Sequence, residues 1–137
     1  MSDPALSVER RREARERALA LLYEAETKDV SPGEVLAALP VAPDPFAADL
    51  VRGVGDASAE LDARIGAVSK GWTVARMPAI DRALLRVGLY ELLYEPDTPT
   101  AVIINEAVEL AGRFSTDDSS RFVNGVLSKL AADVRGA

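Results

Sequence analysis

The sequence predicts an all-α fold, a compact bundle of about six to seven helices. Apolar residues recur at helical spacing in nearly every segment of the 137-residue chain. Proline, glycine and helix-capping residues separate these segments. The β-branched run at 102–104 continues without a break into a helical pattern, and nothing else in the chain resembles a partner strand. We therefore expect helices packed on helices in one domain spanning 1–137.

Three helical segments are predicted in the first half of the chain. Residues 1–6 are expected to be flexible, because the Met-Ser-Asp-Pro start has nothing to bury. A helix over about 7–26 follows, with its apolar stripe confined to the second half. A capping box opens a short helix within 31–40. One long helix is predicted over 45–70, with close packing or a bend near Gly55 because glycines weaken its period.

The most apolar long window is 78–95, PAIDRALLRVGLYELLYE, which we predict to be the central helix. Its apolar residues form two arcs on a helical wheel, and charged residues fill the edges between them. The pattern predicts a helix packed from two directions, with Asp81 and Glu91 on an edge in water. Just before it, 72–77 is read as a short turn in which Trp72 fills a gap beneath the helix.

Two further helices are predicted after the central one. Prolines break the chain, and helical spacing resumes over 101–113. The last helix begins at Thr116 or Asp117, both of which are good capping residues. Asn105 and Asn124 lie inside otherwise apolar stretches, so we expect a buried hydrogen bond between their helices.

The composition excludes several classes of protein. The absence of cysteine removes disulfides, thiolate zinc sites and cysteine nucleophiles, and the absence of histidine removes the usual general base and a common metal ligand. No apolar run approaches the roughly 20 residues of a membrane span. We therefore expect a cytoplasmic protein that contacts no membrane, holds no metal or cofactor, and is not an enzyme.

The charge is unevenly distributed. The whole chain has a formal net charge of −6, which argues against broad non-specific binding of nucleic acid. Residues 1–20 carry five arginines against four acidic residues, a net charge of +1, so residues 21–137 carry −7. A polyanion would therefore have to bind locally, at the amino-terminal end.

The first candidate site is the arginine-rich run at 10–17, RRREARER. Its simplest interpretation is a solvated helix end with Glu to Arg pairs. Tyr23 adds to the run, because it lies within about 20° of Arg12 on the helical wheel and could stack on a base beside a phosphate-binding arginine. The simpler alternative for Tyr23 is a half-buried ring with its hydroxyl in water.

The second candidate site is 114–122, FSTDDSSRF. Carboxylates and hydroxyls at a helix start usually act as capping groups. With Ser119, Arg121 and the ring of Phe122 alongside, however, this start offers donors, acceptors and a stacking surface together, as proteins use to read single-stranded RNA. A metal site formed by Asp117 and Asp118 is weak, since no further ligands are evident.

Four segments together carry a resemblance to a known family. They are the arginine-rich segment from Arg11 to Tyr23, IDRALLRVGLYEL at 80–92, INEAVELA at 104–111 and DDSSRFVNGVL at 117–127. On these motifs the chain resembles the NusB family of transcription antitermination factors over nearly its whole length. The resemblance implies a compact helical protein of two subbundles.

The resemblance also implies a function and a set of contacts. Family members bind the boxA element of ribosomal-RNA leader transcripts with the small-subunit ribosomal protein NusE, in a complex that keeps RNA polymerase from terminating. Glu13 departs from the family's basic run, and Asp81 is one methylene shorter than the usual glutamate. Carried over by motif, the phosphate contacts would be Arg11, Arg12 and Arg15, the RNA track would include Tyr23, Asp118, Arg121 and Phe122, and NusE would meet Asp81 and Leu84.

Two alternatives remain open at this level. The chain could be a helical protein-interaction scaffold without RNA binding, in which case the arginines are only solvated. It could also be a stand-alone relative of the RNA-positioning domain of RNA cytosine methyltransferases. Salt dependence of RNA binding separates the scaffold from RNA recognition through phosphates. Whether the chain is a monomer or a homodimer is not decided by the sequence.

Overall fold

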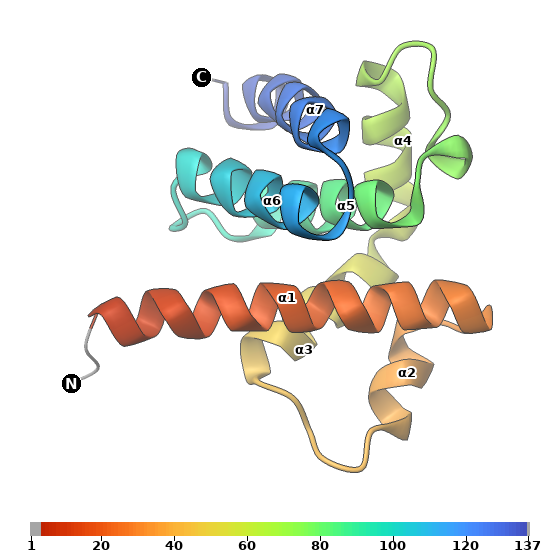
Figure 1. The fold of residues 1–137 in the computed structure, drawn as a ribbon, viewed down its shortest axis with the longest axis vertical. Coiled ribbons are helices and arrows are strands. Elements are labelled where there is room, and N and C mark those ends of the chain that lie inside the picture. The colour runs from red at the N-terminus through yellow and green to blue at the C-terminus, as the bar shows by residue number, and fades with distance from the viewer. Residues whose placement is uncertain (1–3, 137) are drawn as a thin grey trace. The chain divides into compact units, whose positions relative to one another are not determined.

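The computed structural model describes residues 4–136, and this part of the chain is all-α, as predicted. Residues up to Asp56 form one compact unit and residues from Ala57 onward form a second. None of the described helices is long and apolar enough to span a membrane. The elements are α1 (Pro4–Lys28), α2 (Pro32–Ala38), α3 (Pro45–Asp56), α4 (Ser58–Val68), a 3-10 turn η1 (Val74–Arg76), α5 (Ala79–Tyr94), α6 (Thr100–Phe114) and α7 (Asp117–Arg135) (Figure 1).

In the first unit, α2 and α3 pack against α1 and against each other. α1 begins at Pro4, three residues before the predicted start at Ser7. The expectation of a flexible segment over 1–6 falls partly outside the described residues, because 1–3 are not described. The predicted apolar stripe of α1 is buried throughout: Ala14, Ala18, Leu21, Leu22 and Ala25.

Two side chains cap the shorter helices of this unit, and the first of these caps is the one that the capping box predicts. The hydroxyl of Ser31 accepts a hydrogen bond from the Glu34 N–H at 3.1 Å and caps α2. The carboxylate of Asp44 accepts from the Phe46 N–H at 2.8 Å at the start of α3. Both caps precede a proline, whose missing N–H needs no partner in the first turn.

The prediction of a single long helix over 45–70 is wrong, because the helix is interrupted at Ala57, between α3 and α4. Ala57 has φ −99° and ψ 11°, outside the helical region, and the boundary between the two units falls here. Glycines weaken the helix just before the break. Gly55 also serves close packing, because a Cβ at this position would lie 3.3 Å from the ring of Pro32 on α2.

In the second unit, α5 contacts α4, α6 and α7. The prediction of a helix packed from more than one direction is confirmed. The prediction of a wet acidic edge is wrong, because Asp81 is 3% exposed and Glu91 is 1% exposed. Helical periodicity places these carboxylates between the apolar arcs. The number of helices that pack around α5 decides whether that position meets water.

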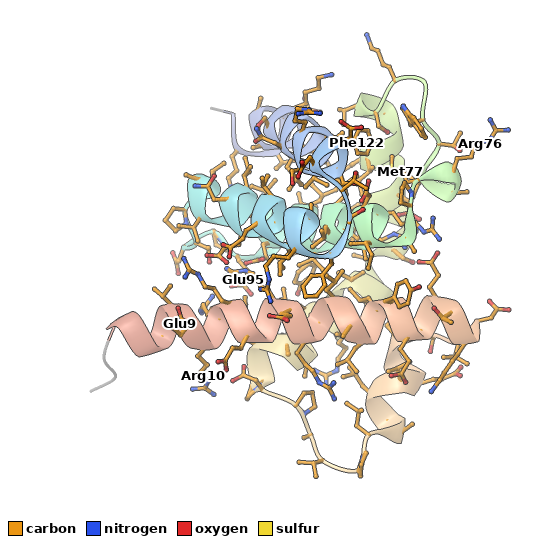
Figure 2. All side chains as sticks on the ribbon, viewed as in Figure 1. Glu9, Arg10, Arg76, Met77, Glu95 and Phe122 are labelled. Atoms are coloured by element: carbon orange, nitrogen blue, oxygen red, sulfur yellow. The ribbon has the colours of Figure 1, made fainter. Side chains whose placement is uncertain are left out.

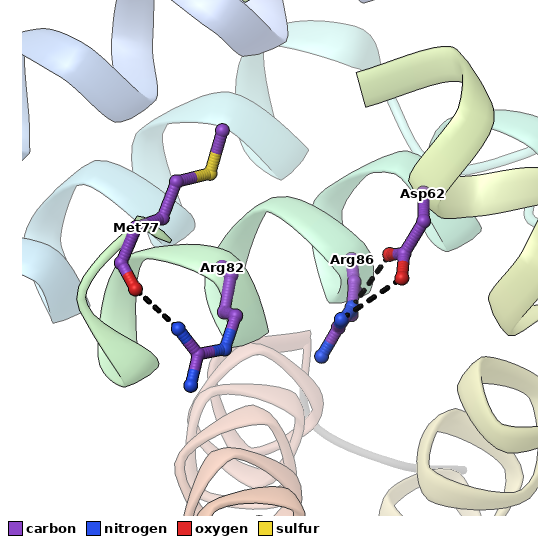
Figure 3. A network of polar contacts seen from close by, with 4 residues as sticks. All are labelled: Asp62, Met77, Arg82 and Arg86. Atoms are coloured by element: carbon purple, nitrogen blue, oxygen red, sulfur yellow. Dashed lines mark hydrogen bonds and ion pairs between the residues drawn. The ribbon is translucent and has the colours of Figure 1, made fainter. Parts of the chain in front are cut away.

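Arginines on the other edge of α5 join it to its surroundings (Figure 3). The Arg86 guanidinium donates to both carboxylate oxygens of Asp62 on α4, at 2.8 and 3.0 Å. Arg82 donates to the backbone carbonyl of Met77, just before the helix. The bidentate pair holds α4 against α5 with defined geometry.

Arg135, the last residue of α7, closes the other end of the unit. Its guanidinium lies at the carboxyl end of α5, where backbone carbonyls lack helical partners. It donates to the carbonyls of Glu91, Leu92, Glu95 and Thr98 and to the hydroxyl of Thr100, at 2.7 to 3.3 Å.

The predicted hydrogen bond between Asn105 and Asn124 is wrong. Both side chains are exposed, and Asn124 accepts from the Ser128 hydroxyl of its own helix at 3.5 Å. Amides inside apolar stretches are buried only if they fall on the packed face, and these two do not.

Gly88 on α5 lies very close to Leu127 on α7. A Cβ built at this position would lie 2.9 Å from both methyl groups of Leu127, which is completely buried. Real Cβ atoms are not found at such a distance. The missing side chain at Gly88 therefore sets how near α7 lies to α5.

We predict opposite effects of alanine at two helical glycines. Gly88→Ala should lower the free energy of unfolding by about 1–3 kcal/mol, because the added methyl overpacks a buried contact. Gly66→Ala on α4 meets nothing within 4 Å and should raise stability by about 0.5–1 kcal/mol, because alanine favours the helix. Urea unfolding of both variants measures these changes, and a Gly88→Ala protein as stable as Gly66→Ala would contradict the packing argument.

Candidate nucleic-acid interface

Three exposed arginines lie near the beginning of α1, and they differ in what they contact. Arg10 points toward the start of α3 (Figure 2), where its Nε lies 2.5 Å from an oxygen of Asp44. Arg12 pairs with Glu9 at 3.3 Å. Arg11 lies over the ring of Phe46, with its guanidinium carbon 4.3 Å from the ring centroid.

Of these three arginines, Arg11 has the guanidinium that is most available to bind an anion. Among the described residues its guanidinium has no hydrogen-bond or ion-pair partner, only the ring beneath it. Stacking on Phe46 holds the guanidinium plane while leaving its N–H groups available. It borders a hollow of about 300 Å³ that is lined by Ser7, Arg10, Arg11, Asp44, Pro45 and Phe46.

The other sequence-predicted residues of α1 are placed differently. Arg15 is 4% exposed, and its guanidinium carbon lies 5.5 Å from the centroid of the Phe46 ring. Of the three predicted phosphate contacts, it is the one that the structure buries. Tyr23 is 45% exposed, and so it keeps a ring face in solvent. Glu13, which interrupts the basic run, is also exposed.

The contact between Arg10 and Asp44 is electrostatic as well as structural. The hydrogen bond from Arg10, followed by the one from the Phe46 N–H, holds the pKa of the Asp44 carboxyl below its usual range. A depressed pKa means that the ionised carboxylate is favoured in the folded protein. The charge on Asp44 therefore contributes to the packing of α3 beside α1.

We predict that this contribution disappears in acid. Because the folded pKa is lowered, the stabilisation is complete above the unfolded pKa, about 3.9, and is lost as the pH falls through the folded value. Asp44→Asn should therefore flatten the fall in unfolding free energy below about pH 4. Arg10→Ala should flatten it less, because the bond to Phe46 remains. Denaturant unfolding at several pH values checks this, and curves parallel to wild type down to pH 3 would refute it.

The beginning of α7 holds the second group of predicted residues. The hydroxyl of Thr116 accepts from the Ser119 N–H at 3.0 Å, so Thr116 caps the helix. The Ser119 hydroxyl donates to Oδ2 of Asp81 on α5 at 2.9 Å. Asp118 and Arg121 form an exposed ion pair. The capping interpretation and the binding interpretation of this segment are therefore compatible.

A pocket of about 290 Å³ opens at this helix start, entirely within the second unit. It brings together three predicted RNA residues, the predicted partner residue Asp81 and the unexpected Trp72. Leu84, the other predicted partner residue, is 1% exposed and does not line it. The lining residues are Trp72, Met77, Pro78, Asp81, Thr116, Asp118, Ser119 and Phe122.

Trp72 is the site residue that sequence reasoning missed. The prediction that it fills a gap beneath the central helix is wrong, because it is 53% exposed. Its ring centroid lies 6.2 Å from that of Phe122, with an interplanar angle of 58°. It follows Gly71, whose φ of 83° turns the chain out of α4. A lone tryptophan in a polar turn was the signal that could have indicated a binding role.

One oxygen of the lining residue Asp81 is enclosed in the protein. Oδ1 of Asp81 is buried and has no hydrogen-bond partner among the described residues. Carboxylate oxygens accept hydrogen bonds and do not donate them when ionised. The described residues contain no group of three acidic side chains arranged to hold a metal ion.

Fold and site together define a class of protein. It is all-α, with an exposed arginine face on its first helix and an aromatic-lined pocket at the start of its last helix. Residues 12–132 match the model of the NusB family. A relative from Leifsonia xyli subsp. xyli, named transcription antitermination protein NusB, is 46% identical over 130 residues, covering 88% of this chain and 90% of that protein. The chain belongs to the NusB family.

Solved structures agree with this membership. T. maritima NusB superimposes with a TM-score of 0.81 at 30% identity, covering 97% of this chain and 94% of that one. A crystal structure of the antitermination factors NusB and NusE in complex with dsRNA gives a TM-score of 0.77 at 25% identity, covering 91% and 98%. The helical fold of this chain is therefore that of NusB proteins.

Proposed function

We propose that this protein is a transcription antitermination factor that binds boxA-type single-stranded RNA of ribosomal-RNA leader transcripts together with NusE. The observation that carries the proposal is the exposed basic face of α1 on a chain that belongs to the NusB family. The proposed role is binding within an RNA polymerase antitermination complex, with no catalytic step, and the proposed location is the cytoplasm.

Arg11 is the central phosphate contact in this proposal. An arginine whose N–H groups are not engaged can bind phosphate without first breaking an ion pair. Arg12 would follow by exchanging Glu9 for phosphate, since that pair is exposed and weak. Arg15 contributes less, because it is buried. Tyr23 supplies an exposed ring, about 16 Å from Arg12 along the helix axis, on which a base can stack.

We predict that Arg11→Ala weakens boxA RNA binding and lowers the slope of log K against log salt by about 1. Arg52→Ala is the matched control, because it removes the same charge from an exposed residue of α3 that pairs with Asp49. Fluorescence anisotropy with labelled RNA over a salt series measures both. Single-stranded and duplex RNA of the same sequence should be compared, because the solved NusB and NusE complex contains dsRNA. Equal slopes for the two variants would show that Arg11 makes no phosphate contact, whereas no measurable binding by the wild-type protein would favour the scaffold without RNA binding.

The negative net charge of the chain favours RNA binding together with a basic protein partner. With a net charge of −6, the protein repels RNA outside its small basic face. A basic protein that covers acidic surface and adds its own phosphate contacts would supply the missing attraction. We assign this role to NusE because the chain belongs to the NusB family. Asp81 and Leu84 remain the sequence-predicted contacts, although both are buried, so NusE would have to reach them through neighbouring surface.

We predict that adding NusE raises the affinity for boxA RNA at least tenfold. The measurement is an RNA titration of this protein with and without NusE, and with NusE alone. Mass in solution, determined with and without RNA, shows at the same time whether a homodimer dissociates when RNA binds. An RNA dissociation constant that NusE leaves unchanged would refute the joint-binding part of the proposal while leaving the test of Arg11 standing.

A further inference from the structure

The pocket at the start of α7 has apolar walls set at an angle. They are formed by the rings of Trp72 and Phe122 and by Met77 and Pro78. Figure 2 shows Met77 and Phe122 close together. The two ring centroids lie 6.2 Å apart, and the rings are inclined at 58°. A flat group cannot stack on both rings at once, whereas a short aliphatic chain can pack against both.

Asp81 is a buried carboxylate without a cationic partner in the described part of the chain. It lines the pocket and is only 3% exposed. Its Oδ2 accepts a hydrogen bond from Ser119 at 2.9 Å, and its Oδ1 accepts none from the described residues. Its place in the first turn of α5 offsets only part of the cost of burying the charge. Such a carboxylate gains most from a ligand that brings positive charge and N–H donors together.

The pocket lining holds a second carboxylate. Asp118 is the other charged residue of the described lining, which contains no basic side chain. Arg121 pairs with Asp118, but both side chains are exposed, so the pair is weak and a competing cation can replace the arginine. Lys70 and Arg76 are exposed and screened by salt, and Figure 2 shows Arg76 directed outward. The net charge of −6 also concentrates cations around the protein.

The positive amino end of α7 opposes a cation, but the helix itself offsets this effect. The Thr116 hydroxyl accepts a hydrogen bond from the Ser119 N–H at 3.0 Å. Asp117 and Asp118 add two carboxylates in the first turn. The carboxylates therefore dominate the electrostatics of the pocket, and a cationic ligand is favoured.

The kind of cation follows from the same residues. The described residues contain no group of three acidic side chains arranged to hold a metal ion. A quaternary ammonium has no N–H and cannot donate to Asp81, whereas a primary ammonium brings N–H donors. Aromatic rings attract either form of ammonium, Trp most strongly. At about 290 Å³ the pocket lies near the lower limit of small-molecule sites, about 300 Å³, so the ligand is short.

We propose that this pocket binds a short aliphatic diamine, one of the small polyamines, between the carboxylates of Asp81 and Asp118. One ammonium donates to Asp81 and lies beside the aromatic rings. The aliphatic chain packs against Trp72 and Phe122, and the second ammonium takes the place of Arg121 at Asp118. This site goes beyond the proposed function, because its occupancy requires neither RNA nor NusE.

A lysine side chain of a protein partner is the other source of an ammonium on an aliphatic stem. It brings one ammonium, so it can satisfy Asp81 but leaves Asp118 to Arg121. Two carboxylates in the lining of one small pocket therefore favour the free diamine. The experiment compares both sources directly.

The test uses the fluorescence of Trp72, which is the only tryptophan of the chain and lines the pocket. The full chain is titrated at low salt with putrescine. Butylamine has the same carbon chain with one ammonium, butanediol has it with no charge, and tetramethylammonium has charge without N–H donors. N-acetyl-lysine amide represents a protein side chain, and sodium chloride controls for ionic strength.

Three variants accompany the titrations. Asp81→Asn removes the buried charge, and Asp118→Asn removes the exposed one. Asp133→Asn is the matched control, because it removes a carboxylate from an exposed residue of α7 outside the pocket lining. Circular dichroism shows whether each variant folds. Asp118→Asn should fold, because the Asp118 side chain is 88% exposed.

We expect putrescine to change Trp72 fluorescence saturably and to bind roughly twofold to fivefold more tightly than butylamine, the factor that an exposed ion pair supplies. Tetramethylammonium should bind at least about tenfold more weakly than butylamine, because it donates no hydrogen bond to the charged acceptor. Asp81→Asn should weaken putrescine binding at least about tenfold, and Asp133→Asn should leave it unchanged. Asp118→Asn should remove the advantage of putrescine over butylamine, which decides the proposal if Asp81→Asn does not fold.

Several results would overturn the proposal. An effect of butanediol or sodium chloride equal to that of putrescine removes the role of the ammonium groups. Unchanged putrescine binding by folded Asp81→Asn places the amine elsewhere, and an equal loss in Asp133→Asn shows only general attraction to an acidic protein. Tighter binding of the lysine amide than of putrescine assigns the pocket to a protein partner. None of these outcomes bears on the test of Arg11, so the proposed function stands or falls separately.

Discussion

The close contact between Gly88 and Leu127 is the constraint on which the second unit depends. Without a side chain at Gly88, α7 can approach α5 to a distance that no other residue would permit. That approach lets the Ser119 hydroxyl reach Asp81 across 2.9 Å. It also puts Phe122 beside Trp72, so the geometry of the pocket follows from packing in the core.

Asp81 is a polar residue enclosed in this core. Burying a carboxylate costs free energy unless every oxygen finds a donor, and here Ser119 satisfies only one of them. Native structures leave few buried polar atoms unsatisfied, and functional sites are where such exceptions concentrate. In the first unit, Arg11 is exposed, lies over the ring of Phe46 and has no acidic partner among the described residues.

Much of the fold was predictable because its signals are local. Ser31, Asp44 and Thr116 cap helices within three residues of their own position, and a sequence displays such short-range chemistry directly. The break at Ala57 was not predictable in the same way, because glycines weaken a helix without stating whether it bends or stops. The site was predicted in part: the sequence indicated Phe122 and its neighbours but not the tryptophan that faces them.

The sequence by itself determined the helical periods, the caps, the arginine run at 10–17 and the motifs of the NusB family. Only the tertiary structure decided which of these side chains meet water. Asp81 and Glu91 were expected on a wet edge and are buried, Trp72 was expected inside and is exposed, and Arg15 was grouped with arginines that remain outside. The physical reason is that a helical period assigns a residue to a face, whereas burial depends on how many other helices cover that face.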